Sequence, residues 1–356
     1  LSTIINLPLS EIYEVATFYA HFNIVKDSKD YNPVNVVRVC ESLTCELFGA
    51  HKLLQDIKKL ENKNIKVVPG PCMGRCNVAP TVCVGKNYVD VANFDKVKKT
   101  IDEKNFDPFI PDYINLSSYK KKGGYEIANK IKNGVISKKQ VLDSLNESGL
   151  KGKGGAGFPT GKKWEIVSNY NGKKYVAVNG DEGEPGTFKD RSYLESDPHR
   201  FLEGALIASY FINAQKVYIY MRDEYPTVIK ILLDEINKME DEEIIPKDFF
   251  IVRRGAGAYI CGEESAMIES IEGKRGLPRH RPPYVAEIGL FGCPTLTNNL
   301  ETLFWVRDII EKGAKWFAEK GSNGNKGFHS FSVSGRVKNP GVKVAPAGIT
   351  IQQLID

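Results

Sequence analysis

The sequence predicts an α/β protein that contains more than one domain. Stretches rich in Val and Ile alternate with stretches of helical apolar spacing, and this happens both before and after a segment rich in Pro and Lys. The length of 356 residues also exceeds that of one ordinary domain. Residues 327–356 then change to closely spaced strands around an Asn-Pro-Gly turn, which indicates the beginning of a small β-rich domain.

The composition narrows the class of protein and of partner. Hydrophobic residues make up 42% and charged residues 26% of the chain, as in ordinary globular proteins. The net charge of +5 comes without a dense basic helix, so no nucleic-acid partner is expected. The longest apolar stretch, near residues 204–212, is too short for a direct membrane span. Seven cysteines, an odd number with tight pairs among them, indicate ligation in a reducing compartment, so a cytoplasmic location is expected.

The first domain is expected over residues 1–105. It opens with a helix over residues 7–22, which Ser10 can cap and in which apolar residues recur at helical spacing. The elements expected after it are strands at 34–39, 65–68 and 81–84 and a helix at about 46–60.

Two pairs of cysteines follow predicted strands of this domain. Cys40 and Cys45 form C-x4-C, and Cys72 and Cys76 form C-x3-C some thirty residues later. Four thiolates suit either a [2Fe–2S] cluster or a structural zinc ion. Zinc usually takes a two-residue spacer, so the spacing favours the cluster and leaves zinc as the alternative. Cys83 lies in an apolar strand and is expected to be a packing residue.

Residues 106–125, with prolines and then lysines, are expected to form a solvated linker. A larger α/β domain is expected over residues 126–326, in which Asp197 caps a helix that has Pro198 at its first position. The other elements expected here are helices at 137–146 and 226–239 and strands at 175–178, 217–220 and 250–252.

A glycine-rich loop and an acidic loop are the candidate binding segments of the larger domain. Residues 152–157 read Gly-Lys-Gly-Gly-Ala-Gly, which fits G-x-G-x-x-G, but a predicted helix precedes them where the dinucleotide fingerprint has a strand. Glycines still let backbone N–H groups approach a phosphate or a flat ring. The alternatives are a flexible loop for this segment and a solvated turn for the carboxylates of residues 181–184.

Three segments of the first domain resemble a known family. They are Val-Cys-Glu-Ser-Leu-Thr-Cys at 39–45, Pro-Cys-Met-Gly-Arg-Cys-Asn-Val-Ala-Pro at 71–80, and residues 8–19. Together they resemble the thioredoxin-like [2Fe–2S] subunit of bacterial NADH dehydrogenase, with residues 8–19 matching the end of its N-terminal helical bundle. The resemblance implies a thioredoxin-like fold with a [2Fe–2S] cluster on Cys40, Cys45, Cys72 and Cys76.

Four further blocks, at residues 152–164, 179–187, 255–264 and 297–302, follow one another in the order of a second family. They are similar to the FMN- and NADH-binding subunit of respiratory complex I, of NAD-reducing hydrogenases and of NAD-linked formate dehydrogenases. The resemblance runs from about residue 125 to the end of the chain. It implies a Rossmann-like FMN-binding α/β domain followed by the start of a β-grasp-like domain, and the same enzyme groups place a two-iron domain ahead of it.

The second resemblance also implies binding residues. For FMN these are Gly152, Gly154, Gly155, Lys163, Asn179, Asp181, Glu182, Tyr259, Gly262, Glu263, Glu264, Asn298, Asn299 and Thr302. For NADH they are Phe158, Lys163, Glu184, Glu264, Arg281 and Tyr284. Phe158 and Tyr284 would stack on the adenine, whereas Ile166 stands where the family has a third aromatic ring. No side chain is expected to act as acid or base, because the flavin carries the hydride and Glu184 only positions the nicotinamide.

The function implied is an NADH dehydrogenase module that passes electrons from FMN to iron–sulfur clusters in other subunits. Alternatives are a module of an electron-bifurcating or NAD-reducing hydrogenase or formate dehydrogenase, and, from another class, a zinc-binding scaffold. The family continues into a helical domain with a four-cysteine [4Fe–4S] cluster. Only Cys83, Cys261 and Cys293 remain here, so that cluster is expected only in a missing C-terminal part. Cys261 is expected to be a structural thiol.

Overall fold

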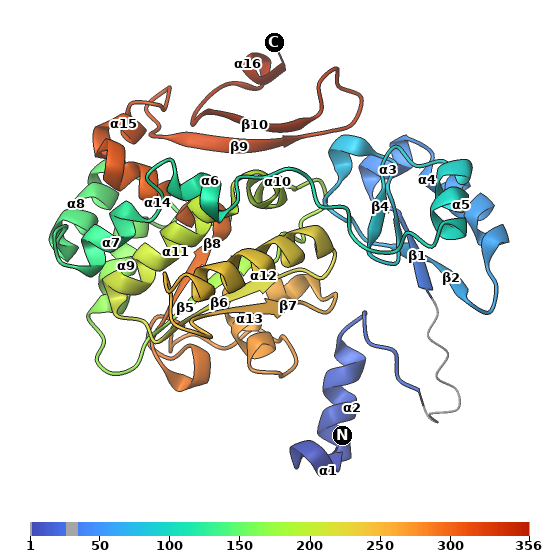
Figure 1. Cartoon of the computed structure of the whole chain (residues 1–356), viewed down its shortest axis with the longest axis horizontal. Coiled ribbons are helices and arrows are strands. Elements are labelled where there is room, and N and C mark those ends of the chain that lie inside the picture. Colours follow the sequence, from blue (N-terminus) through green and yellow to red (C-terminus); the bar gives the residue numbers. More distant parts are fainter. Residues whose placement is uncertain (1, 26–34, 356) are drawn as a thin grey trace.

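The computed structural model describes residues 2–25 and 35–355, and the strands of this part form three sheets (Figure 1). The predicted α/β class is confirmed. The first sheet has the order β2-β1-β3-β4, the second the order β7-β6-β5-β8, and β10 pairs with β9 in a separate hairpin. The strands are β1 (Asn35–Cys40), β2 (Ile65–Gly70), β3 (Val82–Val84), β4 (Asn87–Val89), β5 (Tyr175–Gly180), β6 (Lys216–Met221), β7 (Phe250–Arg254), β8 (Thr295–Asn299), β9 (Phe328–Val333) and β10 (Gly341–Pro346).

The first sheet is mixed, because β1 pairs with β2 in parallel and with β3 in antiparallel orientation. The strands predicted at 65–68 and 81–84 are confirmed as β2 and β3, and the one at 34–39 as β1, except that residue 34 lies outside the described residues. The helix expected at about 46–60 is divided. Gly49, with φ 84°, separates α3 (Leu43–Leu47) from α4 (Ala50–Ile57). The other helix of this domain is α5 (Phe94–Asp102).

The N-terminal segment packs on the second sheet rather than on the first. It forms α1 (Ser2–Ile5) and α2 (Leu9–Phe18), so the expected helix is shorter, and Pro8 rather than Ser10 occupies its N-cap position. Buried Tyr19 packs among residues of the second sheet, and its hydroxyl donates to the carbonyl of Lys274 at 2.6 Å. The segment therefore covers part of one face of this sheet.

The second sheet is entirely parallel, and its strand residues alternate between two cores. Val176 and Val178 of β5 point into the main core, which also contains residues of α11, α12 and α14. Ala177 points to the opposite face, where α13 and the N-terminal segment pack. The helices around this sheet are α7 (Glu126–Lys132), α8 (Lys138–Ser148), α9 (Thr160–Ser168), α10 (Lys189–Ser196), α11 (Pro198–Ile212), α12 (Pro226–Asp241), α13 (Glu264–Ile271), α14 (Leu300–Lys312) and α15 (Ala314–Ala318).

Two predicted helix starts are confirmed by hydrogen bonds. Ser137 caps α8 in a capping box with Gln140. The side chain of Asp197 accepts from the backbone N–H of Arg200, and Pro198 is the first residue of α11. Local capping chemistry therefore fixes where both helices begin.

The segment expected to be a solvated linker differs from that expectation. It contains α6 (Leu116–Lys120), in which Leu116 and Tyr119 are buried in the main core. The buried carboxylate of Glu235 accepts the backbone N–H of Leu116 at 2.8 Å. The three lysines of this segment stand together at 120–122, and only Lys120 belongs to the helix, whose apolar side is buried.

The C-terminal hairpin lies along the edge of both larger parts of the molecule (Figure 1). It is followed by α16 (Ile351–Ile355). Val342 of β10 packs against Cys72, Cys76 and Phe188, so one strand contacts both the cysteine loop and the second α/β unit. Among the described residues, no helix is both long and apolar enough to cross a membrane.

Candidate flavin and cluster site

A cavity of about 500 Å³ lies at the carboxyl ends of the central parallel strands. The chain runs from β5 to β6 and β7 on one side and then returns to place β8 on the other side of β5. The strand order therefore reverses between β5 and β8, and open α/β sheets bind their ligands at such a switch point. Asn179 at the end of β5 and Asn299 at the end of β8 both line the cavity. Its volume is in the range of cofactor sites.

The structure brings many of the predicted residues together around this cavity. Those that line it are Gly154, Asn179, Asp181, Glu182, Glu184, Tyr259, Gly262, Glu263 and Asn299. At Gly154 a Cβ atom would lie 3.3 Å from the Cβ atom of Asn299, so the loop approaches β8 more closely than an ordinary side-chain contact.

Other predicted residues lie behind the lining of the cavity and hold it in place. The ammonium of Lys163 donates to Glu264 at 3.1 Å and to Thr297 at 2.7 Å. The amide oxygen of Asn298 accepts from the indole of Trp164 at 3.0 Å. The hydroxyl of buried Thr302 accepts the backbone N–H of Lys153, in the glycine-rich loop.

The remaining predicted residues are not among those that line the cavity. Phe158 and Tyr284, the two rings expected to stack on adenine, are 44% and 58% exposed. Arg281 pairs with Glu263, whose carboxylate also caps α13. Gly152 and Gly155 belong to the same loop as Gly154, and Gly155 has a left-handed φ of 113°.

The carboxylates of the acidic loop have three different environments. Burial raises the pKa of Asp181 to about 7. Burial and the nearby Asp190 raise the pKa of Glu182 to about 7, and its carboxylate accepts from Tyr225 at 3.0 Å. Glu184 is exposed at the mouth of the cavity, where it accepts a hydrogen bond from the hydroxyl of Tyr259. The loop is therefore built into the protein rather than being a solvated turn.

Sequence reasoning missed several residues of the cavity wall. Thr187, Lys189 and Asp190 all line it. The ammonium of Lys189 lies 2.7 Å from Asp190 and 3.1 Å from the buried carboxylate of Glu301. Lys189 and Asp190 come directly after the acidic block in the sequence, and this adjacency is the signal that could have indicated them.

The four predicted cysteine ligands are all buried and interact in a chain. The thiol of Cys40 interacts with those of Cys45 and Cys72, and the hydrogen bond with Cys40 lowers the pKa of Cys72. The Sγ atoms of Cys72 and Cys76 are 3.4 Å apart. Cys83, as predicted, is a buried packing residue of β3.

The four thiols supply the donor set of a two-iron cluster. Within residues 2–25 and 35–355, no three His, Cys, Asp or Glu side chains form a group that could hold one metal ion. The [2Fe–2S] cluster takes four cysteines in two pairs, and the thiols lie here as two linked pairs. Phe188, which lies between the cavity-lining residues Thr187 and Lys189, packs against Cys72 and Cys76.

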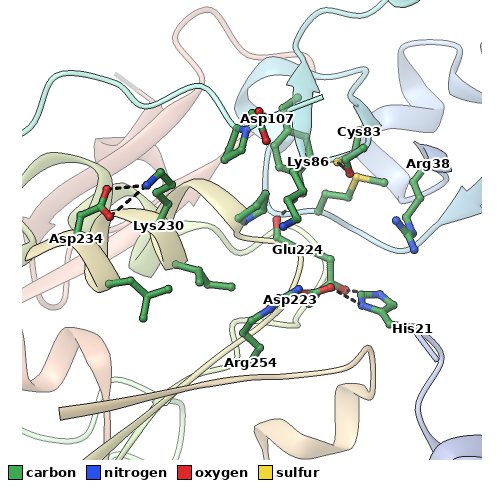
Figure 2. A pocket seen from close by; sticks show the side chains of 17 residues that line it. His21, Arg38, Cys83, Lys86, Asp107, Asp223, Glu224, Lys230, Asp234 and Arg254 are labelled. Atoms are coloured by element: carbon green, nitrogen blue, oxygen red, sulfur yellow. Dashed lines mark hydrogen bonds and ion pairs between the residues drawn. The ribbon is translucent and has the colours of Figure 1, made fainter. Parts of the chain in front are cut away.

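The cysteine loop is in direct contact with the wall of the cavity. Arg222, which follows β6, donates to the carbonyl of Glu182 and to the carbonyl of Cys72, both at 2.6 Å. Arg191 donates to the carbonyl of Gly74 at 2.9 Å. A second cavity, of about 280 Å³, lies beside this contact and is lined by His21, Glu224 and residues of the first sheet (Figure 2).

Two known families match this chain, one in each of the two parts that carried a resemblance. Residues 1–105 match the thioredoxin-like [2Fe–2S] ferredoxin family, and residues 145–308 match the Nuo51 FMN-binding domain. The flavin cavity and the cysteine pairs thus lie in separately recognised parts.

Similar proteins carry related names. The chain is 45% identical over 253 residues to an NADH-quinone oxidoreductase subunit of Aquifex aeolicus, an alignment that covers 69% of the chain and 59% of that protein. It is 43% identical over 256 residues to an NADH-quinone oxidoreductase subunit of Rhizobium meliloti, covering 69% of the chain and 61% of that protein. The chain thus spans less than two thirds of these relatives.

A solved structure matches both parts of the chain at once. It is the crystal structure of an NAD⁺-reducing [NiFe]-hydrogenase in the air-oxidised state, with a TM-score of 0.86 and 28% sequence identity. The match covers 99% of this chain and 65% of that one. The relative placement of the two α/β parts is therefore shared with that structure.

Proposed function

Because the chain joins a thioredoxin-like [2Fe–2S] ferredoxin domain to an Nuo51 FMN-binding domain, we propose that it is the NADH-oxidising module of a larger iron–sulfur oxidoreductase. The single observation that supports this most strongly is structural. The flavin-sized cavity at the switch point and the four-cysteine site share one wall, the loop that contains Glu182 and Phe188. A hydride-accepting group and a one-electron carrier would thus be neighbours.

Bound FMN would supply the chemistry of hydride acceptance and one-electron release. Gly154 would let the backbone approach the flat ring, and Asn179, whose amide donates to the carbonyl of Gly262 at 2.7 Å, would hold the cavity wall in place. Lys153 and Lys189 are the cations of the wall and would offset the negative charge of the phosphate. Asp181 would present either a donor or an acceptor to the flavin edge, depending on pH.

The mouth of the cavity is where NADH would enter. Glu184 and Tyr259 lie there, and Glu184 would hold the nicotinamide end of the nucleotide. The exposed rings of Phe158 and Tyr284 would receive the adenine. The carboxylates of the acidic loop would repel the additional phosphate of NADPH, which favours NADH.

Cys40, Cys45, Cys72 and Cys76 would hold the two-iron cluster, and further iron–sulfur subunits would take the electrons onward. The match to an NAD⁺-reducing hydrogenase also supports the same module working toward NAD⁺ reduction. Ligation of a cluster by cysteines suits a reducing compartment, so we include a cytoplasmic location in the proposal.

The test is a kinetic comparison of the two nucleotides. The chain, loaded anaerobically with FMN, iron and sulfide, should reduce ferricyanide with NADH and should show at least tenfold lower kcat/KM with NADPH. Equal efficiency with the two nucleotides would contradict the charge argument. Absence of NADH-dependent turnover in protein that contains FMN would contradict the proposed function.

A further inference from the structure

Arg222 is the one cation among the described residues that touches both the loop of the flavin cavity and a cysteine ligand through hydrogen bonds of 2.6 Å. One nitrogen of its guanidinium, Nη1, donates to the carbonyl of Glu182, and the other, Nη2, donates to the carbonyl of Cys72. Its side chain is only 4% exposed. A planar guanidinium can hold two acceptors at once in this way, whereas an ammonium cannot do so with fixed geometry.

The position of Arg222 is fixed from every side. It follows β6 directly, its guanidinium lies over the ring of Tyr225 at 5.1 Å, and a carboxylate oxygen of Glu224 lies 3.2 Å from Nη2. Glu224, labelled in Figure 2, is itself largely buried, with a side-chain exposure of 10%. Burial opposes the charge of both groups, but the charges around them outweigh it. The pKa of Arg222 is therefore raised and that of Glu224 lowered, so both groups stay ionised.

A fixed buried cation beside a cluster ligand has an electrostatic consequence. Reduction of a two-iron cluster by one electron adds one negative charge to the group that the four thiolates hold. Charge and hydrogen bonds near the sulfurs set the reduction potential of such clusters. Because Arg222 is shielded from water, its charge is screened little, and it favours the reduced state.

We propose that Arg222 is a positioning residue for electron transfer between the flavin and the two-iron cluster, and that its charge raises the reduction potential of that cluster. This rests on the proposed function, since it requires both cofactors. The guanidinium holds the loop of Cys72 against the loop of Glu182, and Glu224 moderates its charge.

The test is an anaerobic redox titration of the two-iron EPR signal in the full chain loaded with both cofactors. Arg222→Met should lower the equilibrium constant for one-electron reduction of the cluster at least tenfold, a shift of about 59 mV to more negative potential. Arg222→Lys keeps the charge, so the reduction potential of its cluster should lie close to that of the wild type. Glu224→Gln removes the countercharge, so it should shift the potential in the opposite direction.

The opposite signs separate this role from a merely structural one. Loosened packing would move the potential of Arg222→Met and Glu224→Gln in the same direction, and that result would overturn the inference. The inference would also be overturned if Arg222→Met, at full cluster content, changed the equilibrium constant for one-electron reduction by less than threefold. If Arg222→Met does not fold, Glu224→Gln alone decides, and an unchanged or more negative potential overturns the inference. A wild-type chain without any two-iron signal would instead overturn the proposed function, and this inference with it.

Discussion

At the scale of single residues, the mouth of the cavity depends on two side chains with few other contacts. Tyr259 is 66% exposed, and its hydroxyl donates to the exposed carboxylate of Glu184. Neither side chain is part of a core, so we expect the pair to serve binding rather than folding. The neighbouring Glu182, by contrast, is buried, and its carboxylate accepts three hydrogen bonds from the protein.

Glu184→Gln should therefore weaken the use of NADH without loss of FMN. Losing a charged hydrogen-bond acceptor should lower kcat/KM for NADH by roughly tenfold or more. The measurement is steady-state ferricyanide reduction together with the flavin content of the purified variant. Glu165→Gln, on an exposed position of α9, is the matched control and should behave like the wild type. Unchanged kinetics in Glu184→Gln would remove this residue from the proposed site.

Asp181 makes the stability of the flavin-free protein depend on pH. Its pKa is raised by burial from 3.8 to about 7, so folding favours the protonated acid. The contribution of Asp181 to the free energy of unfolding is fully present below pH 4 and is lost as the pH rises toward 7. The loss amounts to up to about 4 kcal/mol, and it is smaller where water in the cavity screens the charge.

Asp181→Asn should remove this loss, because an amide does not ionise. Urea unfolding of the flavin-free protein at pH 5 and pH 8 measures it. Relative to the wild type, the free energy of unfolding of the variant should be higher at pH 8 than at pH 5, where only part of the loss has occurred. The exposed Asp241→Asn is the control. An equal difference at both pH values would show that Asp181 does not titrate in this range.

At the scale of elements, the docking of the cysteine loop depends on a glycine. Gly74 has φ 64°, and a Cβ atom there would collide with the ring of Tyr225 in the second α/β unit. Gly49 has φ 84° but open space around its Cβ position. The two positions share a left-handed backbone conformation, and they differ in the atoms that surround the place of the Cβ atom.

Gly74→Ala should therefore destabilise the chain more than Gly49→Ala does. Both should lose about 1 kcal/mol from the left-handed backbone, and Gly74→Ala should lose a further ~1–3 kcal/mol from the collision. Denaturant unfolding of both variants, with iron analysis, measures this. Equal destabilisation of the two would contradict the observed docking of the loop on Tyr225.

The sequence was informative about elements wherever a local signal existed. The capping residue Asp197, the helix that begins near residue 137, the apolar strand runs and the cysteine pairs all lie where they were predicted. Several features were missed, among them the helices α5, α6, α7, α9, α10 and α14, the strands β4 and β8, and the division of a helix at Gly49. The missed helices and strands pack against other elements, and a single sequence does not display such tertiary contacts.

At the scale of the whole molecule, the parts of the site that sequence could not predict are those made between elements. The glycine-rich loop, the acidic loop and the end of β8 could be predicted as separate segments, and the strand order brings them to one cavity. The partners of Arg222 are distant in the sequence, so no spacing rule indicated that this residue joins the cysteine loop to the cavity. The domain boundaries and the roles of individual site residues stay predictions.

The most direct test of the central claim, that this chain binds FMN in the switch-point cavity and reduces it with NADH, is an anaerobic NADH titration followed by visible absorption. In the chain loaded with FMN, iron and sulfide, the account predicts that the flavin band bleaches with between one and about 1.5 NADH per bound FMN, because FMN takes the two electrons of one hydride and the two-iron cluster can take one more. A flavin band that stays unchanged in excess NADH, in protein with full FMN and iron content, would contradict the account.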